Sequence, residues 1–418
     1  MLRPCIGFEP GGRFPATRRP RKENVMPLHR RLSRARAASG PHPATIVFLL
    51  GFLLLPFAAA GQDADVIAAF SRQMAADVEA DGIGGITAAV FKGDQVLWAQ
   101  GFGWADPGNR VPAGVRTIYR TGSISKSVTA ILMAELVEEG TVALDDAVAD
   151  YLPEAAGFGD PPAGMEPITF RQLASHTAGL IREPELEGAA AGPIEDWGYK
   201  ILASIPHTRF YTMPGTRYQY SNIGYGVLGY ALQRAAGTSF MVLVEDRLFE
   251  PLGMRSSTFI VGPDLWRRVA VGFANGADGA VDADFPALEH DGRGYKVPNG
   301  GVYATVGDLA TFAAAVMPMT EHELLEPATR RDVMTVQTPE DPDSGYGLGF
   351  SIRPVALDGG GDVRFVGHGG SVAGYNMYLV FEPVSGYGVA LGRNYNRGAT
   401  NLGEAGNGLL RALLEAGG

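Results

Sequence analysis

The sequence has 418 residues, of which 46% are hydrophobic and 57 are glycine, and its formal net charge is −10. This composition is typical of a globular protein of one large domain or two intertwined ones. Residues 1–61 hold 10 of the 35 Lys and Arg but only 2 of the 45 Asp and Glu. The remainder therefore has 25 basic and 43 acidic residues, a net charge of −18. This acidity argues against nucleic acid or an anionic membrane as a partner.

The N-terminal segment has the pattern of a secretory signal sequence. A long basic region precedes the uncharged apolar run 46–60, which is short for a membrane span. We predict that residues 1–61 are a signal sequence with a basic extension, cleaved near Ala60, and that the mature protein is secreted or periplasmic without stable membrane association. Met26 is an alternative start, and an uncleaved anchor is the alternative to cleavage. The single cysteine, Cys5, lies in this segment, so the mature chain has no thiol chemistry.

Hydrophobic patterns predict strands near both ends of the mature chain and helices between them. A helix over 66–80 precedes a hairpin of residues 85–91 and 95–103. Residues 141–290 have mainly helical patterns with long loops, including a helix predicted from Gly226 to Ala236. The C-terminal third contains three predicted strands and a closing helix: 363–368, 375–381, 387–392 and 401–414.

This order predicts an α/β fold of the α+β type. An antiparallel sheet is built from both ends of the mature chain and flanked by terminal helices, with a mainly helical region inserted. We expect the sheet part at about 62–120 and 291–418 and the helical part at about 121–290, within one domain over 62–418. A site is expected in the cleft where the two parts meet.

A first candidate site opens a helix at Thr121. Residues 128–139 are apolar on a helical period and are followed by Gly140, which predicts a helix that ends there. Ser123 then lies in the first turn of this helix, and Lys126 lies on the same face, about 4.5 Å further along the axis. The positive end of a helix disfavours an ammonium, so Lys126 is expected to be a neutral base beside a serine nucleophile. A capping serine with a solvated lysine is the alternative. Only four lysines follow residue 61, and an arginine could not act as a base here, which favours the catalytic interpretation.

Two further patterns supply polar groups. Tyr220 near a lysine ammonium would have its phenol pKa lowered and could carry a proton, and Asn222 could bond a substrate amide. His368-Gly369-Gly370-Ser371 is predicted to end one strand and precede another, where Gly370 lets a substrate backbone approach. The N–H of Ser371 could pair with that of Ser123 to hold an oxyanion. Taken alone, each pattern could also be a surface loop.

Taken together, Ser-x-x-Lys at 123, Tyr-x-Asn at 220 and His-x-Gly at 368 resemble the serine β-lactamase and penicillin-binding-protein superfamily. The similarity is greatest to its class C β-lactamase, esterase and D-aminopeptidase branch, and it covers essentially all of the mature chain. Further phrases similar to that family are Leu144-Asp145-Asp146, Tyr151-Leu152-Pro153, Ser175-His176-Thr177-Ala178-Gly179-Leu180, Gly300-Gly301-Val302-Tyr303-Ala304-Thr305 and Tyr346-Gly347-Leu348-Gly349-Phe350.

The resemblance implies a β-lactamase/transpeptidase-like fold and a role for each motif residue. Ser123 would be the acylated nucleophile, Lys126 would share its proton with Tyr220, and Asn222 would contact the substrate. The N–H groups of Ser123 and Ser371 would form the oxyanion hole. No metal or cofactor is implied. Which of Lys126 and Tyr220 takes the first proton stays open, because coupled groups titrate as a pair.

One departure from the family concerns the third motif. Members that bind the carboxylate of β-lactams or D-Ala-D-Ala peptides usually have a lysine where this chain has His368. A histidine has a pKa near 6.5 and is a weak anion anchor at pH 7. We therefore predict a serine hydrolase acting through an acyl-enzyme on an ester or amide, of the esterase or D-amino-acid/cell-wall peptidase type. A true class C-type β-lactamase or DD-carboxypeptidase is the alternative.

Other classes are weaker interpretations. Gly369-Gly370-Ser371-Val372-Ala373 is nearly an α/β-hydrolase elbow, but that elbow needs a helix after its serine, and 375–381 has a strand pattern. A non-hydrolytic penicillin-binding sensor or cell-wall binding protein would not need all three motifs.

The substrate stays open among ester, D-amino-acid peptide, lactone and β-lactam, and so does the oligomeric state. The mature histidines lack the paired spacing of a metallohydrolase: His176, His207, His290, His322 and His368.

Overall fold

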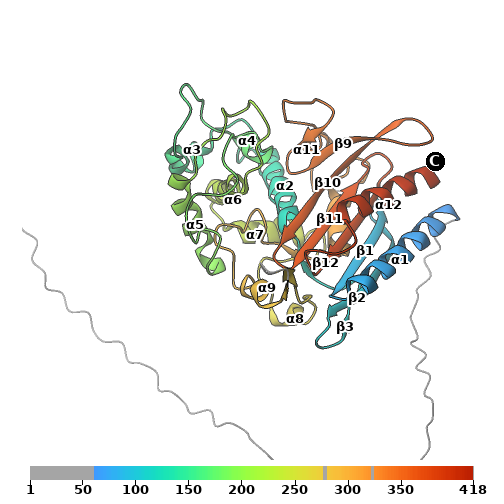
Figure 1. The fold of residues 1–418 in the computed structure, drawn as a ribbon. Coiled ribbons are helices and arrows are strands. Elements are labelled where there is room, and N and C mark those ends of the chain that lie inside the picture. Colours follow the sequence, from blue (N-terminus) through green and yellow to red (C-terminus); the bar gives the residue numbers. More distant parts are fainter. Residues whose placement is uncertain (1–60, 276–279, 322–323, 418) are drawn as a thin grey trace, which may run out of the picture. The chain divides into compact units, whose positions relative to one another are not determined.

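The computed structural model describes residues 61–417 apart from 276–279 and 322–323, so the predicted signal sequence lies outside the described residues. Within these residues, eight strands form one antiparallel sheet in the order β3-β2-β1-β12-β11-β10-β9-β8 (Figure 1). The two ends of the chain meet where β1 pairs with β12, with Ile86 opposite Arg393 and Lys92 opposite Tyr387. The predicted α/β fold, with a sheet built from both ends, is therefore confirmed.

The strands of the large sheet are two to twelve residues long, and two short pairs lie outside it. In sheet order the strands are β3 (Val111–Pro112), β2 (Gln95–Asp106), β1 (Gly85–Lys92), β12 (Tyr387–Arg393), β11 (Tyr375–Phe381), β10 (Asp362–Val372), β9 (Ser351–Ala356) and β8 (Gly345–Tyr346). The pairs are β4 (Tyr119–Arg120) with β7 (Tyr303–Ala304) and β5 (Ala274–Asn275) with β6 (Val281–Asp282).

Terminal helices and inserted helices lie on opposite sides of the sheet (Figure 1). The terminal pair is α1 (Gln62–Asp81) and α12 (Leu402–Ala416). Between them in the chain come α2 (Ser125–Glu138), α3 (Val148–Tyr151), α4 (Phe170–Ala174), α5 (Trp197–Ser204), α6 (Asn222–Ala236), α7 (Phe240–Val244), α8 (Pro263–Trp266), α9 (Asp284–Leu288), α10 (Val306–Val316) and α11 (Pro327–Val333).

Strand β1 is buried on both faces, which explains its almost unbroken apolar sequence. Ile86, Ala88 and Val90 pack with apolar side chains of α1 and α12. Ala89 and Phe91 point to the other face and belong to the core shared with the helical region. The sheet therefore joins two cores.

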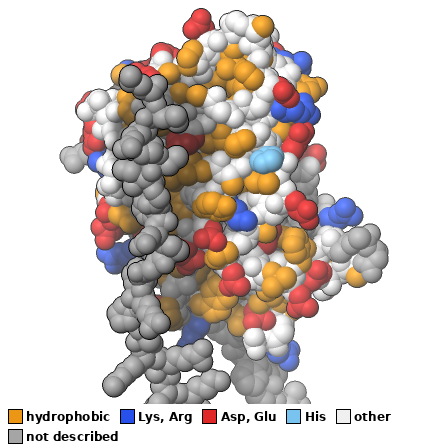
Figure 2. All heavy atoms as spheres, turned by 90° about the vertical axis from the view of Figure 1, so that its left-hand side faces the viewer, with side chains coloured by type: hydrophobic (Ala, Val, Ile, Leu, Met, Phe, Trp, Pro, Cys, Tyr) orange, Lys and Arg blue, Asp and Glu red, His pale blue; other side chains and the backbone are white. Residues whose placement is uncertain are grey.

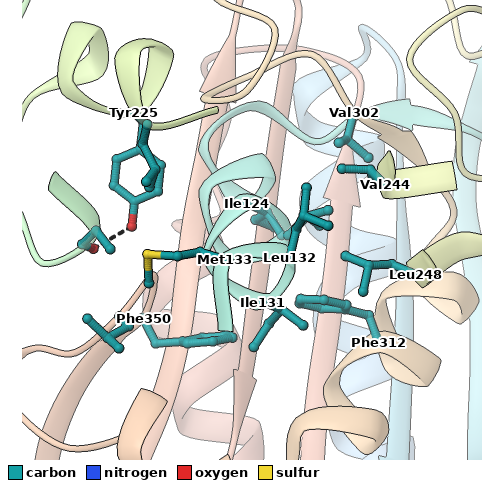
Figure 3. Close-up of a cluster of buried hydrophobic side chains, with 14 of the residues drawn as sticks. Ile124, Ile131, Leu132, Met133, Tyr225, Val244, Leu248, Val302, Phe312 and Phe350 are labelled. Atoms are coloured by element: carbon teal, nitrogen blue, oxygen red, sulfur yellow. Dashed lines mark hydrogen bonds between the residues drawn. The ribbon is translucent and has the colours of Figure 1, made fainter. Parts of the chain in front are cut away.

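Helix α2 is the centre of the larger core. It is buried around most of its circumference, as expected for a helix that is apolar on all sides. Its Ile131 and Met133 belong to one buried cluster with Phe312 of α10 and with Phe350 (Figure 3). Packing on all sides fixes the start of this helix, where Ser123 and Lys126 lie.

Two predicted element boundaries are wrong. Strand β10 continues to Val372, so the His368-to-Ser371 motif lies inside a strand and not in a turn after one; the turn comes at Gly374, where φ is +77°. Helix α6 begins at Asn222 instead of Gly226, because the Ser221 hydroxyl accepts the N–H of Gly224 and caps the helix. The C-terminal part predicted to be sheet also contains α10 and α11.

Within the described residues, no single helix is long and apolar enough to cross a membrane. One pair bent by 84°, Asn222–Ala236 with Phe240–Phe249, meets that test on length and composition.

Candidate active site

Ser123 and Lys126 are adjacent at the start of α2. Ser123 lies in a short 3₁₀ turn, Gly122–Ile124, that leads into the helix. Lys126 Nζ is 3.1 Å from Ser123 Oγ and 3.1 Å from the backbone oxygen of Asn299. The lysine is fully buried, whereas Ser123 is partly exposed. A hydroxyl at the surface of the site therefore has an amine directly behind it.

The surroundings of Lys126 favour its neutral form. Burial is the main cause that lowers its pKa well below the ordinary 10.5, and the positive charge of Arg182 acts in the same direction. The sequence predicted a neutral amine from the helix end, but the structure gives desolvation as the dominant cause. A neutral amine 3.1 Å from a hydroxyl can accept its proton.

Tyr220 is the third member of this group. Lys126 Nζ lies 4.8 Å from its ring centroid, and its hydroxyl is hydrogen-bonded to Ser123. The predicted lowering of its pKa is wrong, because burial raises the pKa of Tyr220 above its ordinary value. A buried lysine that favours its neutral form is a poor source of the positive charge that would offset this desolvation. The phenol therefore stays protonated at neutral pH and can donate a hydrogen bond or a proton.

His176 holds the chain on both sides of Tyr220. Its Nδ1 accepts the N–H of Ser221 at 3.1 Å, and its backbone oxygen accepts the N–H of Gln219 at 2.7 Å. The imidazole centroid is 4.2 Å from that of the Tyr220 ring. The sequence marked His176 only as part of a phrase similar to the family, and its backbone φ of +59° shows a conformation that few side chains adopt.

Strand β10 lies directly against the Ser123 turn, and two glycines permit this contact. A Cβ atom on Gly370 would be 1.9 Å from the Thr121 oxygen and 3.2 Å from the Ser123 nitrogen. Gly122 has a φ of +55°, and a Cβ atom there would be 2.7 Å from the Ser371 nitrogen. The backbone nitrogens of Ser123 and Ser371 therefore both lie close to this contact. An oxyanion hole formed by their N–H groups stays a prediction.

His368 lies in β10 beside the same site and is almost completely buried. Its Nδ1 is 2.6 Å from the Gly369 oxygen, which can only accept, so Nδ1 donates and Nε2 accepts the hydroxyl proton of Tyr346 at 2.9 Å. Burial is the main cause that lowers the pKa of His368 to about 3. The imidazole is therefore neutral with both nitrogens occupied, and it does not supply an anion anchor.

Asn222 lies at the start of α6, and its amide is engaged within the protein. Its Nδ2 donates to a Glu183 carboxylate oxygen at 2.6 Å, and its Oδ1 is buried without a partner among the described residues. Glu183 also receives the Tyr295 hydroxyl proton and an ion pair from Lys296 at 3.1 Å. Because Asn222 does not line the pocket at Ser123, a contact with substrate stays a prediction.

Two pockets flank Tyr220 and His368. One, of about 550 Å³, lies on the side of Tyr218, Glu340 and Tyr346. The other, of about 690 Å³, opens at Ser123 and is also lined by Arg182. Four of its polar side chains were not predicted from the sequence, namely Asn376, Asn396, Arg397 and Thr400.

The structure also bears on two alternative chemistries. Ser371 lies in β10 and is followed by a turn and β11, so it lacks the helix that an α/β-hydrolase nucleophile requires. Among the described residues, no group of three or more His, Cys, Asp or Glu side chains could hold a metal ion.

Comparison with known proteins gives concordant matches. A family model described as Beta-lactamase matches residues 69–412. A D-alanyl-D-alanine-carboxypeptidase/endopeptidase, AmpH of Escherichia coli K12, is 27% identical over 323 residues, 73% of this chain and 78% of that protein.

Similar solved structures include an octameric penicillin-binding protein homologue from Pyrococcus abyssi. It is 26% identical, with a TM-score of 0.65, and the match covers 78% of this chain and 73% of that one. A D-stereospecific amidohydrolase from Streptomyces shares the fold at 24% identity, with a TM-score of 0.64 over 84% of this chain and 97% of that one. These findings support a serine hydrolase of this superfamily. Since the family model spans most of the sequence, the chain belongs to the beta-lactamase family.

Proposed function

We propose that this protein hydrolyses an ester or amide through an acyl-enzyme, with Ser123 as nucleophile and Lys126 as its base. The observation that carries the proposal is the buried Lys126 amine, which favours its neutral form and lies 3.1 Å from Ser123 Oγ. A weak nucleophile becomes reactive when a base within hydrogen-bond distance takes its proton.

Acylation begins when Lys126 Nζ accepts the hydroxyl proton of Ser123 as Oγ bonds to the substrate carbonyl carbon. The carbonyl oxygen gains the negative charge and is held by the backbone N–H groups of Ser123 and Ser371. Lys126 takes this first proton because its pKa is lowered, whereas the raised pKa of Tyr220 makes a phenolate an unfavourable starting base.

The tetrahedral intermediate collapses when its bond to the leaving group breaks. The Tyr220 hydroxyl gives its proton to the departing oxygen or nitrogen, and the Lys126 ammonium replaces that proton. Water then attacks the carbonyl carbon of the Ser123 ester and loses a proton to the same pair. The bond between that carbon and Ser123 Oγ breaks, Oγ takes the proton back from the pair, and the acid is released.

Tyr220→Phe is expected to affect poor leaving groups far more than good ones. An alkyl ester or an amide needs a proton as it departs, so the loss should reach about 10²-fold or more in kcat/KM. A p-nitrophenolate departs without a proton, and its ester should lose much less. Rates for a matched alkyl and p-nitrophenyl ester of one acid measure the difference; equal losses would remove Tyr220 from this role.

Gly370→Ala is expected to damage the oxyanion hole. The added Cβ would lie 1.9 Å from the Thr121 oxygen, so β10 must move and the two N–H groups separate. We expect kcat/KM to fall by about 10²-fold, the scale of losing an oxyanion donor. Gly369→Ala is the matched control, because its nearest contact would be an ordinary 3.5 Å to the Tyr378 side chain. A similar loss in both variants would contradict this explanation.

The substrate class that we propose is an ester or a D-amino-acid or cell-wall peptide. The names of AmpH and of the Streptomyces amidohydrolase support this class, and so do the predicted signal sequence and extracytoplasmic location. The absence of a third-motif lysine disfavours efficient β-lactam turnover.

A panel of a short p-nitrophenyl ester, a D-alanyl-D-alanine peptide and a chromogenic cephalosporin tests the choice. We expect ester or peptide hydrolysis to dominate. Efficient cephalosporin turnover without ester or peptide cleavage would reverse this ranking, and a burst of acyl-enzyme without turnover would favour a penicillin-binding sensor.

A further inference from the structure

The pocket at Ser123 is positively charged in an acidic protein. Three arginines line it, and neither Asp nor Glu does, although residues 62–418 contain 43 acidic and 25 basic residues. On the helical side of the molecule, in contrast, acidic and basic side chains are interspersed (Figure 2). A cleft lined by one sign of charge favours ligands of the opposite sign. The pocket is therefore suited to an anionic substrate group.

The three arginines are not equally available. Arg393 is buried, and its guanidinium donates to the backbone oxygens of Tyr395, Thr400 and Asn396, which fixes the loop after β12. Arg397 is exposed and belongs to that same loop. Arg182 comes from another part of the chain, the segment between α4 and α5.

Arg182 has a fixed backbone and an available side chain. Its carbonyl oxygen accepts the N–H of Asn222 at 2.8 Å and that of Ile223 at 3.3 Å, so its backbone is attached to the first turn of α6, directly after Tyr220. Its guanidinium carbon lies 4.8 Å from the centroid of the Tyr220 ring. The side chain is 62% exposed, and its nearest carboxylate, Glu183, is 3.8 Å away, beyond hydrogen-bond distance.

A guanidinium stacked on an aromatic ring keeps its N–H edge free for a ligand, and this edge matches a carboxylate in a two-point hydrogen bond. In this protein the stacking ring is Tyr220, which is hydrogen-bonded to Ser123. The arginine edge is therefore close to the reacting carbonyl of a bound substrate. The third motif offers no competing cation, because both nitrogens of His368 bond within the protein.

We propose that Arg182 binds a carboxylate of the substrate and so acts as the anion anchor that the third motif lacks. This inference rests on the proposed function and names its substrate class: an ester or amide with a free carboxylate near the scissile bond. The preferred substrate is then an anionic acyl compound or a peptide with a free C-terminus.

Two matched ester pairs test the inference. In one pair the acyl part is adipate, as the free acid or its methyl ester, with phenol as leaving group. In the other pair the carboxylate, free or methylated, is on the leaving phenol of an acetate ester. Each enzyme is assayed on the plateau of its own pH profile, because removal of the Arg182 charge also raises the pKa of Lys126.

For Arg182→Gln, the ratio of kcat/KM for the free acid to that for the methyl ester should fall about 10- to 100-fold in at least one pair, the scale of a charged hydrogen bond. Arg182→Lys should restore part of this selectivity. Arg209→Gln removes another exposed arginine, which pairs with Glu185 outside the pocket, and should leave the ratio unchanged.

An unchanged ratio in Arg182→Gln, with Ser123-dependent hydrolysis of the methyl esters, would overturn this inference alone. A fall of this ratio in Arg397→Gln instead of in Arg182→Gln would also overturn the inference. Failure of the wild type to cleave any of the four esters and any carboxylate peptide would contradict the proposed function itself.

Discussion

Ser123→Ala is expected to lower kcat/KM by about 10⁴-fold or more on every substrate that the wild type cleaves. The variant loses the atom that forms the covalent bond, and the oxyanion donors and the base act only together with it. Alanine is well tolerated in a helical turn, so folding should persist. Hydrolysis rates compared at equal thermal stability measure the effect. Activity that survives in this variant would show that the mechanism is wrong.

Ser371→Ala is the matched control. Its side chain is exposed and the proposed chemistry uses only its backbone N–H, which alanine keeps. Its loss should be orders of magnitude smaller than that of Ser123→Ala. The reverse order would make Ser371 the nucleophile, as an α/β-hydrolase interpretation requires.

Lys126→Arg is expected to lower kcat/KM by about 10³- to 10⁴-fold, the upper range for loss of a general base. Arginine stays protonated in proteins and cannot accept the Ser123 proton. In the wild type, kcat/KM should rise with pH as Lys126 loses its proton, and because its pKa is lowered, the rise should end well below pH 10.5. A profile that rises only near pH 10.5 would contradict a neutral Lys126.

Lys126→Met separates the effect on catalysis from the effect on folding. Folding lowers the pKa of Lys126, so at pH 7, where the unfolded lysine is protonated, burial of this side chain costs free energy. Methionine has no such cost, and this inactive variant should unfold at a higher temperature than the wild type. The difference should shrink as the pH rises toward 10.5, where the unfolded lysine also becomes neutral.

Local periodicity was sufficient to predict the pairing of Ser123 with Lys126, because three residues of helix place two side chains on one face. It also predicted β1, β11 and β12, whose apolar runs are bounded by turn residues. Gly369 and Gly370 misled the prediction of β10, since glycines usually end strands. Here Gly370 serves the contact with the Ser123 turn instead.

Properties that depend on contacts between distant segments could not be predicted from local periodicity. The raised pKa of Tyr220 follows from its burial among other segments. The stacking of Arg182 on Tyr220 joins two parts of the chain that share no local pattern. Asn222 bonds to Glu183 by the same kind of long-range contact. Motifs therefore predicted which side chains meet, and the fold determined their protonation and their partners.

The most direct test is covalent labelling of the folded protein with a fluorophosphonate, followed by proteolysis and mass spectrometry of the peptides. We expect one adduct, on the peptide that contains Ser123, with labelling abolished in Ser123→Ala and strongly slowed in Lys126→Arg. An adduct on Ser371, or labelling that persists in Ser123→Ala, would contradict the central claim that Ser123 is the nucleophile and Lys126 its base.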